Sequence, residues 1–327
     1  MTQKAVGIDI SKQTFDVFLL AGEKSAKASF DNNKNGFIKF NRWLKKHDAH
    51  GAAACLEATG RYGDALATYL FEAGYPVSVV NPIRIKAYAR SRMERNKTDA
   101  IDSQVIAHFC LTQEPDLWSP PPEHVKELQA LTRHLQTLKD ERVRLINRLK
   151  SGLSSPFVIN ELQEQKSFLD RRIAKADQVI QAHIATHPDL DKNHSLLQSI
   201  SGIGVLTASL LLAEIPDISC FETVEQLTAF AGLSPTLTQS GSSINRQGGI
   251  NKMGRKRLRT SLYMPALVAM RHNPIVKTFA ERLQKRGLAK MVVVVACMRK
   301  LLHLAFGVLK TRTVFDPYYL VNRQHTA

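Results

Sequence analysis

The spacing of hydrophobic positions predicts an α/β domain at the start of the chain. Short apolar runs at residues 4–10, 14–20 and 25–31 indicate three strands, the first two as an antiparallel pair. Short apolar runs and helical spacings alternate after them. They predict a helix at 36–46, a strand at 52–58, a helix at 62–74, a strand at 75–80, and helices at 83–93 and 99–111. The order βββαβαβα is typical of an α/β fold.

A different pattern follows the proline-rich stretch at 114–124. Leucines recur every three or four positions, with Arg142 in one core position, and a second apolar run continues after a break at 151–157. This predicts an antiparallel coiled-coil arm, and such a seam can also dimerise. The apolar positions are Leu128, Leu131, Leu135, Leu138, Leu145 and Leu149, then Leu162, Leu169, Ile173, Ala176 and Ile180.

From about residue 190 the pattern indicates a mainly α-helical domain with glycine turns. We therefore expect three domains, at 1–118, 119–190 and 191–327. Residues 291–310 have the length of a membrane span, but Arg299, Lys300 and His303 lie near their middle, where charge in hydrocarbon is costly. We expect a buried helix there and no membrane partner.

Charge adds an expectation about partners. The chain of 327 residues carries a formal charge of +16, which exceeds what solubility needs and indicates a polyanion, above all nucleic acid. The four cysteines are far apart and form no zinc or disulfide pattern, and the N-terminus lacks the apolar core of a signal peptide. A reduced cytoplasmic location, associated with the nucleoid, fits these features.

Four acidic residues stand at the ends of predicted elements. Asp9 and Glu57 each end an apolar strand, and Asp99 and Asp102 are three residues apart on one face of a helix that Thr98 could cap. If they converge, they suit two Mg²⁺ or Mn²⁺ ions and phosphoryl transfer on nucleic acid. Each acid alone could equally be a solvated surface group.

The stretch 236–259 combines serines with a basic cluster. Ser240, Ser242 and Ser243 surround Gly241, and the basic residues downstream are Arg246, Lys252, Arg255, Lys256, Arg257 and Arg259. Its composition is that of a flexible loop, and a basic run is usually a solvated face. In so basic a chain, phosphate contacts are the stronger interpretation, and a serine activated by nearby charge could attack phosphorus.

Residues 196–215 predict a helix, a turn at Gly202 and Gly204, and a second helix. The amide groups at the start of the second helix could contact a DNA backbone. A tight turn without any ligand is the alternative.

The motifs resemble a known family. The segments "GIDISK", "LEATGRYGDAL", "RNKTDAID", "SISGIGVLTASLLLAEI" and "SGSS" are similar to those of the DEDD transposases of insertion-sequence family one-ten, which include bridge-RNA-guided recombinases and the Piv invertase. The resemblance covers almost the whole chain. It implies an RNase H/RuvC-like N-terminal domain and a helix-hairpin-helix-like segment in the C-terminal transposase domain.

The resemblance also implies roles. The catalytic tetrad maps onto Asp9, Glu57, Asp99 and Asp102, and Ser240 becomes the nucleophile that forms a covalent link to DNA. The implied partners are donor and target DNA, a structured noncoding guide RNA, and further copies of the chain in a dimer or tetramer. The rival functions are a Holliday-junction resolvase, a DNA invertase and a noncatalytic nucleic-acid-binding scaffold.

Overall fold

A computed structural model describes residues 4–58, 60, 62–91, 99–215, 217–240 and 244–318, and it describes the backbone alone at 99–101, 237–240 and 244–248. Within these ranges the chain divides into two compact units, with the boundary at Pro120. The helical arm shares a core with the C-terminal helices and therefore belongs to the second unit. The division into three domains remains a prediction.

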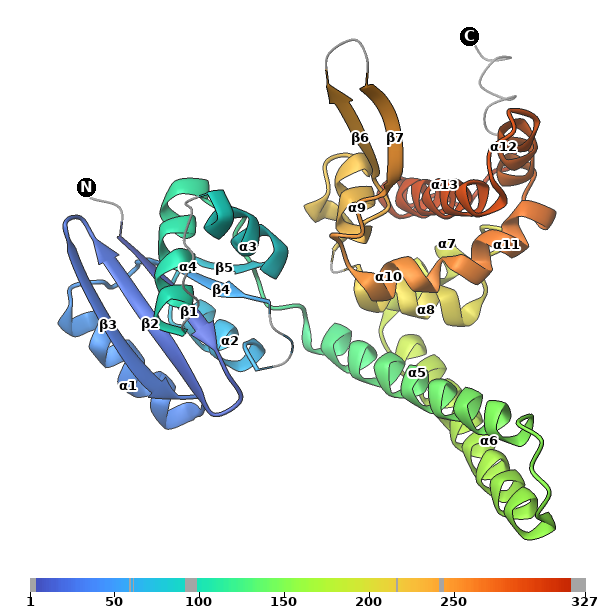
Figure 1. The fold of residues 1–327 in the computed structure, drawn as a ribbon, viewed down its shortest axis with the longest axis horizontal. Helices are drawn as coiled ribbons and strands as arrows, with labels where there is room; N and C mark the ends of the chain where they lie inside the picture. The colour runs from blue at the N-terminus through green and yellow to red at the C-terminus, as the bar shows by residue number, and fades with distance from the viewer. Residues whose placement is uncertain are drawn as a thin grey trace. The chain divides into compact units, whose positions relative to one another are not determined.

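The first unit is built on a five-stranded sheet (Figure 1) in the order β3-β2-β1-β4-β5. The strands are β1 (Lys4–Ile10), β2 (Thr14–Ala21), β3 (Lys24–Asp31), β4 (Ala53–Glu57) and β5 (Val77–Val80). β2 pairs antiparallel with β1 and β3, whereas β4 lies parallel to both β1 and β5. The central strand β1 is apolar at most positions because helices cover both of its faces.

Helices cover the two faces of this sheet. α1 (Lys34–Lys46) and α2 (Asp64–Glu72) cover one face, where Phe37, Phe40 and Leu66 pack with Val6 and Ile8. α3 (Pro82–Ser91) and α4 (Asp99–Gln113) cover the other. The α/β prediction is confirmed, with every predicted element of this unit present. The spacing of hydrophobic residues was therefore sufficient to predict the strands and helices of this unit.

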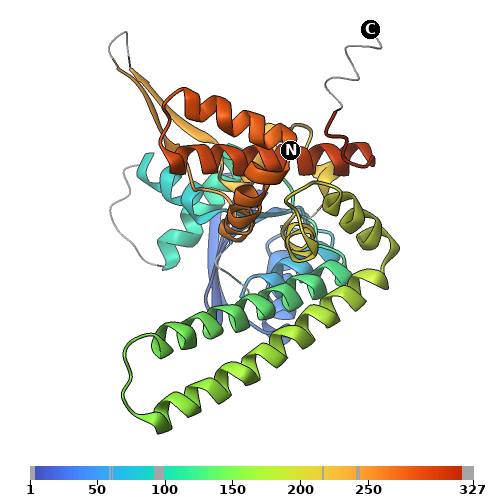
Figure 2. The same cartoon turned by 90° about the vertical axis from the view of Figure 1, so that its right-hand side faces the viewer.

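The second unit begins with an antiparallel helical hairpin, α5 (Glu123–Leu149) and α6 (Pro156–Ala185), which Figure 2 shows from the side. Arg142, predicted in a core position of the seam, is half-exposed and forms an ion pair with Asp170 of α6. The N-terminal part of α5 and the C-terminal part of α6 join the main core through Leu128 and Ile180. The helical hairpin is confirmed; coiled-coil packing remains a prediction.

The rest of the second unit is a layered set of helices and one β-hairpin. In chain order the elements are α7 (Pro188–Gln198), α8 (Val205–Glu214), the 3-10 helix η1 (Ile218–Cys220), α9 (Val224–Ala231), β6 (Pro235–Ser240), β7 (Ile244–Ile250), α10 (Lys256–Ser261), α11 (Tyr263–His272), α12 (Pro274–Lys285) and α13 (Lys290–Thr311).

α13 is the apolar helix that the sequence singles out at 291–310. It is the one described helix long and apolar enough to cross a membrane, with a mean hydropathy of 1.9. Cys297, Leu301 and Ala305 are fully buried, and the helix packs against α7, α9, α11 and α12. The prediction of a buried helix is confirmed, because its apolar side chains form the core of this unit.

Candidate active site

Asp9 and Glu57 lie at the same end of the sheet. β1 and β4 are parallel neighbours, and Ile8 is in register with Leu56, so the two acids occupy the next position on each strand. Alternate residues of a strand share a face. Ala5 and Cys55 pack in the cluster beneath α4, which places Asp9 and Glu57 on the face covered by that helix. Both are half-buried, and each takes part in an interaction within the structure.

The direction of α4 brings its first turn to the same place. A Cβ at Gly7 would overlap the Ser103 carbonyl oxygen and the Ala107 amide nitrogen, so this helix lies directly on β1. Further along, Cys110 Sγ donates to the Ala53 carbonyl oxygen at 3.7 Å, near the start of β4. α4 therefore runs opposite to β1, and its beginning lies towards the ends of the strands that carry Asp9 and Glu57.

The two remaining predicted acids are in that first turn. α4 begins at Asp99, whose side chain is outside the described residues, as is the predicted cap Thr98. Asp102 is half-buried and shares a helix face with Ile106 and Phe109, which are buried against the sheet. The backbone thus gathers three elements that carry the four acids at one end of the sheet.

A fifth carboxylate, which the sequence reasoning missed, lies beside them. Asp16 of β2 is directly opposite Asp9 in the antiparallel register and is half-buried. Cross-strand partners share a face, so Asp16 also faces α4. The signal was available in the alternation of "TFDVFLL", where Asp16 falls between the buried residues Phe15 and Val17.

The donor set suits a hard divalent cation. Carboxylate oxygens from separate elements are the ligands that Mg²⁺ prefers. Among the side chains that the structure describes, which exclude that of Asp99, no group of three or more His, Cys, Asp or Glu is close enough to hold an ion. The donor types suit the expected metal, whereas the described carboxylates do not converge closely enough to coordinate it, and metal binding is a proposal.

The predicted serine loop is a β-hairpin instead. β6 pairs antiparallel with β7, and Ser240, the last residue of β6, is opposite Ile244. Thr236 Oγ1 donates to the Gly249 carbonyl oxygen at 2.7 Å near the base. Gly241, Ser242 and Ser243 fall outside the described residues, as does the Ser240 side chain. Two short stretches with β-branched residues flank the serine-glycine segment, and their pairing overrides the loop-like composition.

The base of this hairpin is tightly packed. A Cβ at Gly254 would overlap the backbone at Gly232, which ends α9 in the left-handed region at φ +69°. The Arg255 amide donates to the Phe230 carbonyl oxygen at 2.7 Å, and its guanidinium lies over the Phe230 ring, 5.0 Å from the centroid. The hairpin is thereby fixed to α9 just before α10 begins.

The predicted basic cluster divides into two groups. Arg255 lies 3.5 Å from the buried Glu214 carboxylate, and Arg259 donates to the Ala231 carbonyl oxygen at 3.0 Å, so both make internal contacts. Lys252, Lys256 and Arg257 are exposed and accessible to a phosphate. The Arg246 side chain is outside the described residues.

The predicted glycine turn joins α7 to α8. Gly202 has a φ of +108°, and a Cβ there would lie 2.7 Å from the Ala269 Cβ of α11, so packing alone explains this glycine. Gly204 precedes the first residue of α8 and has open space around it. The helix, turn and second helix are confirmed; DNA contact at Gly204 and Gly202 remains a prediction.

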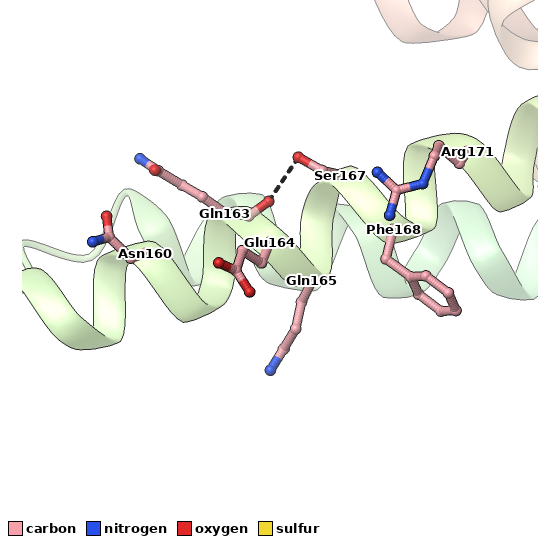
Figure 3. Close-up of a pocket in the computed structure, with 7 residues that line it drawn as sticks. All are labelled: Asn160, Gln163, Glu164, Gln165, Ser167, Phe168 and Arg171. Carbon is pink, nitrogen blue, oxygen red and sulfur yellow. Dashed lines mark hydrogen bonds between the residues drawn. The ribbon is translucent and has the colours of Figure 1, made fainter.

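One pocket has no convergent chemistry. It is a shallow hollow on α6 lined by Asn160, Gln163, Glu164 and Phe168 among others (Figure 3), and Ser167 Oγ donates to the Gln163 carbonyl oxygen at 2.9 Å. All its lining residues come from a single helix. A site would need polar groups converging from several elements.

Comparisons with known proteins identify relatives over nearly the whole chain. A family model described as "Transposase" matches residues 6–158, and a second, described as "Transposase IS116/IS110/IS902 family", matches residues 194–281. The pilin gene-inverting protein of Moraxella bovis is 34% identical over 319 residues, which cover 97% of this chain and 98% of that protein. The transposase for insertion sequence element IS1111A of Coxiella burnetii is 26% identical, over 82% of this chain and 78% of its own.

Among solved structures, T. thermophilus RuvC in complex with a Holliday junction substrate matches 34% of this chain and 96% of its own. The TM-score is 0.27 and the identity 14%. The assignment therefore rests on the sequence relatives.

Proposed function

Because the chain belongs to the IS116/IS110/IS902 family of transposases, whose members cleave and rejoin DNA, we propose how its residues divide that reaction. The acids Asp9, Glu57, Asp99 and Asp102 bind divalent metal in an RNase H/RuvC-like first unit. Ser240 attacks the DNA and becomes linked to it. The exposed basic residues that follow the serine hairpin, Lys252, Lys256 and Arg257, hold the phosphate backbone.

One observation carries the assignment of the acids. Two half-buried carboxylates, Asp9 and Glu57, follow paired positions on adjacent parallel strands, and the helix that covers them begins with the turn from Asp99 to Asp102. Carboxylates gathered in this way repel one another and would repel a phosphate, unless positive charge is present between them. Bound Mg²⁺ or Mn²⁺ would supply that charge and stabilise the negative charge that develops on the phosphate oxygens.

Ser240 would exchange one phosphodiester for another. Its Oγ forms a bond to phosphorus while the bond from phosphorus to one deoxyribose oxygen breaks, and the serine proton is transferred to a base. The deoxyribose oxygen leaves as a hydroxyl. Because the number of phosphodiester bonds is unchanged, reversal of this step with a different DNA end rejoins the strands without ATP.

The basic cluster near the hairpin supports this role. Lys252, Lys256 and Arg257 are exposed in the segment that follows β7, on the same unit as Ser240. Cations placed near an attacked phosphate lower the cost of the developing charge. The resemblance to guided recombinases further implies a structured noncoding RNA as partner, and an assembly in which the acids of one chain meet Ser240 of another.

Site-specific inversion is a second candidate within the same chemistry. The Moraxella bovis relative, which matches nearly the full length of both chains, is a pilin gene-inverting protein. Inversion and transposition use the same cleavage and rejoining steps and differ in how the recombining sites are arranged. Sequencing the DNA joints that the chain produces on a substrate with two inverted sites distinguishes the two outcomes.

Trapping the covalent intermediate tests the proposal. The chain is incubated with Mg²⁺ and DNA that contains the boundaries of the insertion sequence that encodes it. It should form a protein–DNA species that survives denaturation. Ser240→Ala should abolish this species while DNA binding persists, and the neighbouring variants Ser242→Ala and Ser243→Ala serve as matched controls. An adduct that persists in Ser240→Ala rejects the nucleophile, whereas cleavage without any adduct indicates hydrolysis by a resolvase.

A further inference from the structure

The positive charge of the chain is concentrated in one part of the second unit. Residues 246–312 contain sixteen lysines and arginines and a single acidic residue, Glu281. Sixteen less one gives +15, nearly the whole formal charge of +16. Only six of these sixteen belong to the cluster at 246–259. The other ten lie on elements to which the proposed chemistry assigns no role.

Four of these ten form an exposed group around the end of α12. Arg282, Lys285 and Arg286 lie in or just after the last turn of this helix, and Lys290 begins α13. All four are exposed, whereas Val276, Ala280 and Leu283 turn the opposite side of α12 into the core. We call these four residues the α12 corner.

The basic side chains of the α12 corner have no neutralising partner among the described residues. Lys310 donates to the Phe221 carbonyl oxygen at 2.8 Å, and Arg312 to Asn193 Oδ1 at 2.7 Å. Within the described ranges, no ion pair involves any of the four corner residues. Arg282 lies over the Phe279 ring at 5.4 Å from its centroid, which leaves its outer edge free for a phosphate.

In the helical arm, by contrast, basic and acidic residues are nearly balanced. Residues 123–185 contain eleven lysines and arginines and eight acidic residues. Arg142 and Lys166 are both paired with Asp170. A mixed surface of that kind is what solubility requires, whereas a surface of a single sign attracts a polyion of the opposite sign.

The corner is also separate from the hairpin that carries Ser240. α13 contacts α9 through His303, whose Nε2 lies 3.2 Å from Thr228 Oγ1, and the hairpin base is fixed to α9 at Phe230. Lys290 precedes His303 by thirteen residues of one helix, which is roughly 20 Å at 1.5 Å per residue. That length corresponds to about six base pairs of duplex DNA.

We propose that the α12 corner, formed by Arg282, Lys285, Arg286 and Lys290, binds the phosphate backbone of duplex DNA beyond the cleaved position. This inference rests on the proposed function only for DNA as the ligand, and not on Ser240 or the acids. The corner holds the duplex at a second point and carries no sequence information, because backbone contacts position a duplex without reading its bases.

Salt dependence of binding measures the contact. The full-length chain and the variant Arg282→Gln/Lys285→Gln/Arg286→Gln/Lys290→Gln are titrated onto a duplex of about 30 base pairs, without divalent metal, at several salt concentrations. Each lost phosphate contact lowers the salt slope by about 0.9, so the slope should fall by about 3–4. Between about 50 and 200 mM salt, the unaltered chain should therefore lose about 100-fold more affinity than the variant.

A control with the same change in charge separates a local contact from net charge. Arg144, Arg148, Arg171 and Lys175 are four exposed basic residues of the arm, and their replacement by Gln also removes four charges. This control should leave the salt slope within about one unit of the unaltered chain. An equal fall in both variants, or no fall in the corner variant, overturns the proposal.

Three further measurements complete the experiment. If the fourfold variant does not fold, as judged by its thermal unfolding, the pair Arg282→Gln/Lys285→Gln should lower the slope by about 2. Binding to anionic phospholipid vesicles that is lost in the corner variant, with DNA affinity unchanged, would assign the corner to a membrane surface and overturn the proposal. Ser240→Ala should show the unaltered slope, so failure of the nucleophile assignment leaves this result interpretable.

Discussion

The guanidinium of Arg255 lies 3.5 Å from the carboxylate of Glu214, whose side chain is only 5% exposed at the end of α8. The same carboxylate lies 4.0 Å from Arg133 Nε of α5. One buried acid therefore connects the arm, α8 and the segment that follows the serine hairpin. Phosphate contact by Arg255 stays a prediction, and in the structure this side chain also contacts Glu214 and Phe230 at the base of that hairpin.

Replacing Arg255 by Ala should lower the free energy of unfolding by about 1–3 kcal/mol, because a buried carboxylate loses one of its cationic partners. Urea denaturation of the full chain measures the change. Arg257→Ala removes an exposed arginine two residues away and should stay within about 0.5 kcal/mol of the unaltered chain. Equal losses in the two variants would show that Glu214 gains nothing from Arg255.

A methyl group at Gly7 should displace α4 from the sheet. The added Cβ would overlap backbone atoms of Ser103 and Ala107, which cannot rotate away as a side chain could. Gly7→Ala should therefore cost about 1–3 kcal/mol or more in stability and reduce DNA cleavage by moving Asp102 relative to Asp9. Gly307→Ala, in open space within α13, is the control and should be neutral or slightly stabilising.

Removal of divalent metal should abolish DNA cleavage and spare DNA binding. The proposed metal ligands are on the first unit, whereas the exposed basic residues that hold phosphate are on the second. A chelator should stop cleavage, and Mg²⁺ or Mn²⁺ should restore it; Asp9→Asn and Asp102→Asn should each lower cleavage by about 100-fold or more. Full cleavage in either variant would reject the carboxylate site.

His303 should make the stability of the second unit depend on pH. Burial, followed by the positive charges of Arg299 and Lys300, lowers the pKa of His303 below its usual value, while Glu225 opposes the shift. The unfolded chain then binds a proton more readily than the folded chain. Stability from this residue is complete above about pH 6.5 and is lost as the pH falls towards the lowered folded pKa.

Measuring the thermal unfolding temperature from about pH 7.5 to about pH 5 tests this expectation. The unaltered chain should lose more stability over that interval than His303→Asn, which keeps a polar group near Thr228 but does not titrate. Parallel profiles for the two proteins would mean that other groups cause the pH dependence.

Local features were predictable from the sequence, and long-range ones were not. The strands around Asp9 and Glu57 were predicted because their apolar runs identify them without knowledge of the partners. The three-residue spacing of Asp99 and Asp102 likewise defines a helix face by itself. The proximity of Asp16 to Asp9 depends on strand register, and the contact of Gly7 with α4 depends on packing between segments about 100 residues apart.

The serine hairpin was predicted as a loop, and the internal contacts of Arg255 were not predicted, for a physical reason. The serine and glycine content suggests a loop, although the residues of β6 and β7 pair as strands. Arg255 cannot be distinguished from Arg257 by sequence, because only the fold brings Glu214 and Phe230 to one of them. Net charge indicates the class of partner, whereas the contacts of a single basic residue depend on the fold.

Ser240 is the last residue of β6, whose backbone pairs with that of β7. Fixing the backbone of one residue costs about 1–2 kcal/mol of conformational entropy, and a serine in an unstructured loop would incur that cost for several residues at each encounter with substrate. The paired backbones of β6 and β7 bear this cost during folding. The rate of attack should then depend less on the positioning of the Ser240 backbone than on the binding of DNA.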